Sequence, residues 1–346
     1  TSAALLSDVI IACMGLDANL EGEEGDANND YASGDKPNLN LPGLQQQLME
    51  RVVAVGKPTI LVLSSGSALA VNFAQEHCNA VVQNWYAGSF GGQAVADLLF
   101  GAYSPSGRLP VTFYKGTEDL PDFTDYAMEG RTYRYLHCEP LYPFGHGLSY
   151  TDFSIERLTA ETDTFTDSVT VHAEVINKGS RGGKTVIQIY VSDKESTLTK
   201  PVRELKAFRK IHLEPNERKT VSFTLDRCAF ESYDPNLRQW VMEEGFYKIY
   251  AGLSSRDLQA DCTVYADVVS AYTYGKNTSV KVIMENDELK TVLRTFFEET
   301  QLPWTAILTS YEYTAQDTIG MILDQVSCRE QDRETLFSRM RSVKKR

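Results

Sequence analysis

Hydrophobic residues in the first third of the chain form short continuous runs that alternate with helical patterns. The runs at residues 9–15, 59–63 and 80–85 contain little polar alternation, which predicts buried parallel strands. A helix is predicted to begin at Pro42, and two more are predicted at 68–74 and 92–100. The face of the first helix that should be buried carries Leu44, Leu48, Val52 and Val55. This alternation predicts an α/β domain with a mostly parallel sheet over residues 1–114. Three strands are few for such a sheet, so we expect the domain to be incomplete on its N-terminal side.

The hydrophobic period changes twice further along the chain. Residues 115–150 are rich in Tyr, Pro and Gly without a sustained period, and predict an ordered aromatic connector packed over the domains on either side. Residues 151–268 alternate apolar and polar positions between regular turns, which predicts an antiparallel β-sandwich. A helical period returns in residues 269–346 and predicts a small helical tail. Positions that carry these periods are Val169, Val171, Ala173 and Val175 in the sandwich and Leu289, Val292, Leu293 and Phe296 in the tail.

Net charge, apolar run length and cysteine spacing limit the kinds of partner and metal site that we expect for this chain. The 346 residues carry a formal net charge of −13, which argues against nucleic acid as a partner. No run of about 18 apolar residues is present to span a membrane. The six cysteines have no Cys-x-x-Cys pair or zinc-ligand spacing, so we expect reduced, mostly buried thiols and no metal site. Together with the lack of a recognisable signal peptide, this favours a cytoplasmic over a secreted location. The chain starts at Thr1, so we also expect a truncated N-terminus that could have carried such a peptide.

An acidic segment follows the first predicted strand and is the main candidate for chemistry. Glu21, Glu23, Glu24 and Asp26 fall within six positions, just past the strand end where ligands bind in open α/β sheets. Crowded carboxylates repel one another, which raises the pKa of at least one of them and suits it to act as a general acid. A solvated loop, or a divalent-cation site of oxygen ligands, remains an alternative for this segment.

Several motifs, in the same order along the chain, resemble glycoside hydrolase family 3 enzymes of the β-glucosidase and β-xylosidase type. The resemblance covers roughly residues 9–265. The blocks that carry it are Gly15-Leu16-Asp17 with Glu21-Gly22-Glu23, Gly34-Asp35-Lys36, Leu41-Pro42-Gly43, Trp85-Tyr86-Ala87-Gly88, Pro105-Ser106-Gly107-Arg108-Leu109-Pro110, Arg131-Thr132-Tyr133-Arg134-Tyr135, Pro143-Phe144-Gly145-His146-Gly147 and Val202-Arg203-Glu204-Leu205.

The resemblance implies a partial α/β sandwich domain, a fibronectin-type-III-like β-sandwich and a retaining glycosidase mechanism on β-linked glucose or xylose, without a cofactor. Glu23 aligns best with the general acid/base of the family, with Glu21 next and Glu24 third. The nucleophile of the family belongs to a preceding (β/α)8 barrel, and no residue here matches that barrel. We therefore expect the chain to need a barrel, in cis or in trans, and to be inactive alone. One departure is Lys36, where the family often has an arginine.

Other candidates favour structural roles. We interpret His146 as a packed connector residue, and Trp85 and Tyr86 as core or interface aromatics more than as a sugar-stacking platform. Gly91-Gly92 lacks a nucleotide-binding pattern, and Asn277 heads a sequon that we take as accidental. The rival hypothesis for the whole chain is a non-catalytic carbohydrate-binding or interaction module.

Overall fold

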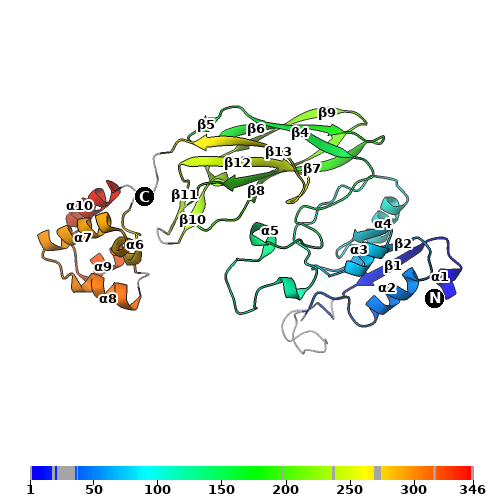
Figure 1. Ribbon diagram of the computed structural model, residues 1–346, viewed down its shortest axis with the longest axis horizontal. Helices are drawn as coiled ribbons and strands as arrows, with labels where there is room; N and C mark the ends of the chain where they lie inside the picture. Colours follow the sequence, from blue (N-terminus) through cyan, green and yellow to red (C-terminus); the bar gives the residue numbers. More distant parts are fainter. Residues whose placement is uncertain are drawn as a thin grey trace.

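The computed structural model describes residues 2–17, 20–21, 36, 38–196, 198–235, 238–268, 274–314 and 317–343. Figure 1 shows an α/β part in blue and cyan, a β-sandwich in green and yellow, and a helical tail in orange and red. The tail lies near the end of the sandwich that carries β10 and β11, away from the α/β part. The fold class predicted from the sequence is confirmed.

The α/β part is built on a small parallel sheet with strand order β1-β2-β3. Its pairing register sets Ile10 opposite Thr59 and Leu61 opposite Val81. Buried side chains such as Met49, Leu61 and Leu69 form its core. The elements of this part are α1 (Ser2–Leu5), β1 (Ile10–Gly15), α2 (Gln45–Val53), β2 (Thr59–Ser64), α3 (Asn72–His77), β3 (Ala80–Gln83) and α4 (Gly91–Leu99).

Two element boundaries differ from the prediction. The third strand ends at Gln83 instead of residue 85, because Trp85 has a positive φ of 55° that is incompatible with an extended strand. The helix predicted at 68–74 lies at Asn72–His77. The residues before it form a loop whose backbone bonds elsewhere: Ala70 N–H donates to Leu39 O at 2.7 Å, which is incompatible with a helix there.

Two surfaces of the α/β part, one on β1 and one on α2, are more exposed than predicted. Ile11 is 49% exposed and Cys13 is also exposed, so β1 is not the fully buried strand that its apolar run indicated. Leu44 and Leu48 are 70% and 52% exposed, whereas Met49 is fully buried. The predicted buried face of α2 is therefore wrong, since the packed side of this helix centres on Met49.

The connector contacts both neighbouring domains. It contains η1 (Thr117–Asp119) and α5 (Thr132–Tyr135). Tyr142 pairs with Phe113 of the α/β side through an isolated β-bridge. On the sandwich side, Tyr133 lies edge-on to Tyr190 with ring centroids 6.0 Å apart, and Ser255 N–H donates to Phe144 O at 2.9 Å. Residues 115–150 therefore pack against both neighbouring parts of the chain.

The sandwich packs a five-stranded sheet (β5-β13-β12-β7-β8) against a three-stranded sheet (β4-β6-β9). The two-residue period holds: the apolar positions Val169, Val171, Ala173 and Val175 of β6 are all buried. A separate hairpin pairs β10 with β11. The elements are β4 (Phe153–Ala160), β5 (Thr164–Phe165), β6 (Val169–Asn177), β7 (Gly183–Asp193), β8 (Glu204–Leu213), β9 (Arg218–Leu225), η2 (Arg227–Ala229), β10 (Ser232–Asp234), β11 (Gln239–Val241), β12 (Gly245–Gly252) and β13 (Leu258–Ala266).

The tail is a small helical unit with its own core, which also includes Val241 of β11. An antiparallel bridge joins Ser279 to Thr318, and each of these residues caps the helix that follows it. The predicted apolar face is confirmed for Leu289 and Leu293, which are fully buried. The helices are α6 (Val280–Glu285), α7 (Asp287–Glu299), α8 (Thr305–Tyr313), α9 (Ile319–Gln325) and α10 (Glu330–Arg341).

The structure also bears on membrane-spanning helices and on the exposure of the cysteines. None of the helices in the described ranges combines the length and hydropathy needed to cross a bilayer. The expectation of mostly buried thiols is wrong, because Cys13, Cys138 and Cys228 are exposed and only Cys328 is buried. Cys13 is exposed because it shares the uncovered face of β1 with Ile11.

Candidate active-site loop

The segments that follow the three parallel strands meet around one carboxylate. Residues 16–21 follow β1, residues 65–68 follow β2, and Trp85 and Tyr86 follow β3. The carboxyl ends of parallel strands lie at the same edge of a sheet, where ligands bind in open α/β folds. Glu21 is the residue that the other two segments contact.

Hydrogen bonds to the backbone fix the direction in which the chain leaves β1. The Gln45 side chain accepts from Gly15 N–H at 2.8 Å and donates to Gly15 O at 2.9 Å. The next turn is closed by Asp17, whose backbone oxygen accepts from Leu20 and Glu21, each at 3.0 Å. These bonds direct the segment toward the loop after β2.

Three donors converge on the Glu21 carboxylate. The Gly66 N–H donates to Oε2 at 3.0 Å, and the hydroxyls of Ser67 and Tyr86 also donate to the carboxylate. A Cβ at Gly66 would lie 3.0 Å from the Tyr86 ring and 3.1 Å from Glu21 Oε2, so a larger residue there would crowd both partners. The carboxylate is thus held by the ends of both neighbouring strands.

These contacts set the protonation of the cluster. Burial works to raise the pKa of Glu21, but the hydrogen bonds from Ser67, Tyr86 and Gly66, together with the charge of Lys36, outweigh it and lower the pKa. Burial and the neighbouring Glu21 charge raise the pKa of Tyr86 to about 12. Burial also lowers the pKa of Lys36, whose Nζ donates to Ala68 O at 2.9 Å. Glu21 is therefore a stable anion near neutral pH.

The candidates predicted from sequence fall into two groups. Glu23, Glu24 and Asp26 lie outside the described residues. Glu21 is described, and its lowered pKa is opposite to the shift that we expected for at least one member of the acidic segment. The partners of Glu21 include two residues that the sequence reasoning missed, Gly66 and Ser67. A Ser-Gly-Ser turn directly after a buried strand is the signal that could have found them.

The other candidates occupy packing positions. Trp85 lies edge-on to Phe113, with ring centroids 6.4 Å apart. His146 stacks on Tyr142 at 5.3 Å, and burial with the nearby Arg108 charge lowers its pKa. Within the described residues, no three His, Cys, Asp or Glu side chains gather to hold a metal ion.

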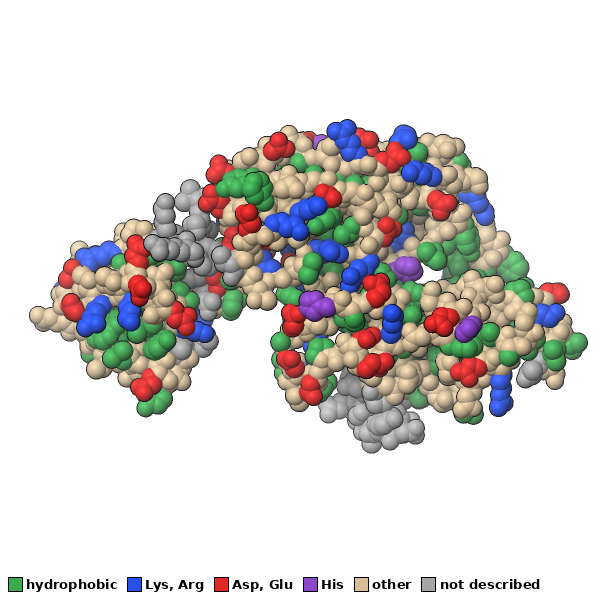
Figure 2. Space-filling model, in the orientation of Figure 1, with side chains coloured by type: hydrophobic (Ala, Val, Ile, Leu, Met, Phe, Trp, Pro, Cys, Tyr) green, Lys and Arg blue, Asp and Glu red, His purple; other side chains and the backbone are tan. Residues whose placement is uncertain are grey.

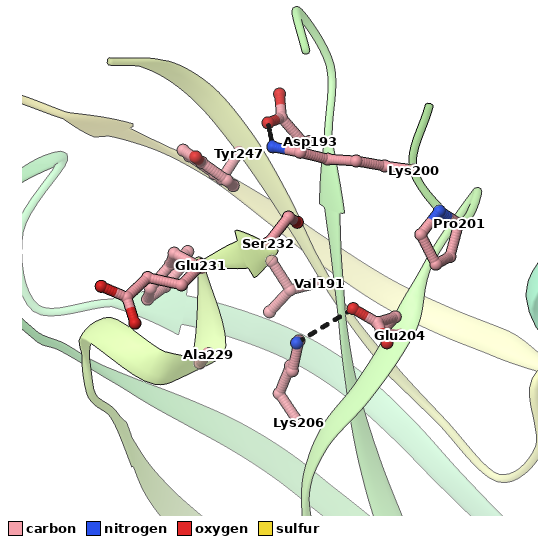
Figure 3. A pocket seen from close by; sticks show the side chains of 11 residues that line it. Val191, Asp193, Lys200, Pro201, Glu204, Lys206, Ala229, Glu231, Ser232 and Tyr247 are labelled. Atoms are coloured by element: carbon pink, nitrogen blue, oxygen red, sulfur yellow. Dashed lines mark hydrogen bonds and ion pairs between the residues drawn. The ribbon is translucent and has the colours of Figure 1, made fainter. Parts of the chain in front are cut away.

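A pocket in the sandwich is too small for a substrate. It has a volume of about 20 Å³ and lies between β7, the start of β8 and the segment before β10 (Figure 3). A space of that size holds about one water molecule. Lys200 closes one side, with Nζ 2.5 Å from Asp193 Oδ2 and 2.7 Å from Glu243 Oε2. The three side chains are 7–10% exposed, so this is a buried ion triad of the sandwich.

The charged surface has no single dominant sign on the face that Figure 2 shows. Acidic and basic side chains are interspersed there over the sandwich and the connector.

The fold and the loop at its strand ends define an open α/β domain with a polar cluster at the carboxyl edge of its sheet, followed by an antiparallel β-sandwich. Residues 1–150 match the Glycosyl hydrolase family 3 C-terminal domain, and residues 185–255 match the Fibronectin type III-like domain. Residues 1–150 therefore belong to the C-terminal domain of glycoside hydrolase family 3.

Relatives of known name cover the same two domains. A xylan 1,4-β-xylosidase of Xylanibacter ruminicola is 39% identical over 249 residues, which are 72% of this chain and 29% of the relative. A β-glucosidase of Bacteroides ovatus is 36% identical over 279 residues, covering 75% of this chain and 36% of the relative. The chain thus spans about a third of the length of these relatives.

Solved structures agree with this assignment. A β-glucosidase of Erythrobacter marinus superposes with a TM-score of 0.68 at 35% identity, covering 78% of this chain and 35% of that one. A β-glucosidase of Kluyveromyces marxianus in complex with glucose gives a TM-score of 0.67 at 32% identity, covering 77% and 33%.

Proposed function

We propose that this chain supplies the general acid/base of a retaining glycosidase that removes terminal β-linked glucose or xylose, with Glu23 as the catalytic residue. The nucleophile comes from a (β/α)8 barrel domain, in cis or in trans, and no cofactor takes part. In this mechanism a carboxylate attacks the anomeric carbon while the acid protonates the leaving oxygen. The names of the family 3 relatives, a β-xylosidase and two β-glucosidases, support the substrate class.

The observation that carries the assignment is the state of Glu21. Its carboxylate accepts three hydrogen bonds and its pKa is lowered, so it is poorly suited to retain a proton for a leaving group. It is well suited to anchor the start of the acidic segment to the ends of β2 and β3. Glu23 follows two residues later in the chain. An anchored Glu21 therefore favours Glu23 over Glu21 as the acid.

The test is Glu23→Ala in the complete enzyme, assayed on cellobiose and on a dinitrophenyl glucoside. Cellobiose has a poor leaving group, so its hydrolysis should fall by about 10²–10⁴-fold. The dinitrophenolate leaves without protonation, so formation of the glycosyl-enzyme should be nearly spared. Removing the acid also removes the base for the second step. Azide needs no base, and it should restore turnover by attacking the anomeric carbon and displacing the enzyme carboxylate.

Glu24→Ala is the matched control, since it removes a neighbouring carboxylate of the same segment. It should retain near wild-type rates on both substrates. If Glu23→Ala instead kept wild-type rates, the role would pass to Glu21 or Glu24. Equal loss on both substrates without azide rescue would indicate a structural role for Glu23.

The second candidate function is a non-catalytic carbohydrate-binding or interaction module. A groove between α8 and α9 of the helical tail favours sugar binding without catalysis.

A further inference from the structure

A groove in the tail runs between α8 and α9, and its size suits a small ligand. Its volume is about 370 Å³, within the range of roughly 300–1,000 Å³ that is typical of ligand sites. By contrast, the pocket in the sandwich is about 20 Å³. The family matches end at residue 255, so they assign no role to this part of the chain.

The lining of the groove mixes polar and apolar surface, and none of its described residues is basic. Thr305, Thr309 and Thr314 contribute hydroxyls, and Gln325 contributes an amide. These groups can donate and accept hydrogen bonds with a neutral ligand. Because the lining residues include no lysine or arginine, the groove offers nothing to neutralise a phosphate or a carboxylate ligand.

Among the described lining residues Asp317 is the charged one, and its orientation is fixed. Its Oδ2 accepts hydrogen bonds from Ser310 Oγ and Thr314 Oγ1, each at 2.9 Å. Ser310 is only 6% exposed and so holds the carboxylate from the interior side. No described residue donates to the other oxygen, Oδ1, which remains available to accept ligand hydroxyls. Hydrogen bonds from hydroxyls to a carboxylate are charge-assisted and stronger than neutral ones.

An aromatic side chain completes the site. Tyr313 at the end of α8 lines the groove and is 80% exposed. The face of an aromatic ring is electronegative, and it attracts the slightly positive C–H face of a pyranose. An exposed ring beside a fixed carboxylate, an amide and several hydroxyls matches what a sugar presents, one C–H face and a rim of hydroxyls.

We propose that this groove is a non-catalytic binding site for a neutral β-linked oligosaccharide. The polar character of the ligand follows from the groove itself, and the β-linkage rests on the proposed function. Bound there, a glycan chain would be held at the tail while the catalytic loop acts at a distance.

The experiment titrates the whole chain with cellohexaose and with xylohexaose, using isothermal calorimetry, and with maltohexaose as the α-linked comparison. We expect one of the β-linked probes to bind with a dissociation constant on the order of 1 mM or tighter. Tyr313→Ala should weaken binding at least about tenfold, since it removes the stacking surface. Asp317→Asn keeps an oxygen for Ser310 but loses the charge, and should also weaken binding.

Tyr311→Ala is the matched control, because Tyr311 is on the same helix, is 39% exposed and does not line the groove. The Tyr311→Ala variant should bind the β-linked probe with the affinity of the wild type. Circular dichroism checks that the tail remains folded in every variant. The proposal is overturned if neither β-linked probe binds, if maltohexaose binds equally well, or if Tyr313→Ala binds like Tyr311→Ala. Binding is measured without turnover, so a failed catalytic assignment at Glu23 leaves this result unaffected.

Discussion

The buried triad around Lys200 allows a quantitative test of what stabilises the sandwich. Lys200 Nζ contacts both Asp193 and Glu243, and its side chain is only 9% exposed. Ser196 Oγ donates to Glu243 Oε2 at 2.7 Å, so the triad also orders the segment between β7 and β8. Lys200→Met removes the cation and leaves two carboxylates facing each other in a nearly dry space.

Removing one partner from a buried ion cluster costs about 3–5 kcal/mol, because the remaining charge is no longer compensated. For a domain of this size, each kcal/mol lowers the melting temperature by about 4 °C, so we expect a drop of roughly 10–20 °C. The control is Lys178→Met in the same sandwich. Lys178 is 52% exposed and lies 3.3 Å from Glu156, and such surface pairs contribute at most about 1 kcal/mol.

Scanning calorimetry of the chain measures both variants, and the sandwich transition is the one to follow. The combination of Lys200→Met with Asp193→Asn and Glu243→Gln removes the uncompensated charges and should recover more than half of the lost stability. If Lys200→Met melted with the small shift expected of Lys178→Met, the triad would not stabilise the fold. If the triple variant were no better than the single one, charge compensation would be the wrong explanation.

Three further outcomes are expected. The chain alone should not hydrolyse aryl β-glucosides, and robust turnover that is lost in Glu23→Gln would falsify this expectation. The apolar side chains exposed on β1 should bind a hydrophobic dye or promote self-association, and Ile11→Lys should reduce this; a monodisperse, dye-negative wild type would contradict it. The folded-state pKa of Glu21 lies below its ordinary value of 4.5, so its stabilising contribution is complete above that value and is lost as the pH falls through the lowered pKa. Urea midpoints of Glu21→Gln and wild type should therefore converge at acidic pH, and a constant difference would argue against the anchoring role.

Much of the architecture was predictable because it depends on local period. The continuous apolar runs predicted the strands of the parallel sheet, and the alternation around Val171 predicted the sandwich, whose inward positions are buried. Boundaries were less predictable, since they depend on single backbone conformations. The positive φ of Trp85, for example, ends β3 two residues early.

The exposed side of the α/β part could not be predicted from the pattern. Leu48 and Met49 are both apolar neighbours in one helix, yet one is half exposed and the other fully buried. Periodicity shows that a helix has an apolar face, but the centre of that face depends on which elements pack against it. The same reason applies to Ile11 and Cys13, which are both apolar, but the sequence pattern did not show whether another element of the fold packs over their side of β1.

The sequence by itself determined the class of each segment, the family resemblance and the place of the acidic segment after the first strand. Only the tertiary structure decided which groups surround Glu21. Gly66 lies 45 residues away along the chain and Tyr86 lies 65 residues away, and the sheet brings both to one carboxylate. A pKa depends on burial, hydrogen bonds and charges within a few ångströms, whatever their separation in sequence. Carboxyl groups that look equivalent in the sequence therefore become an anchor or a candidate acid only through the fold.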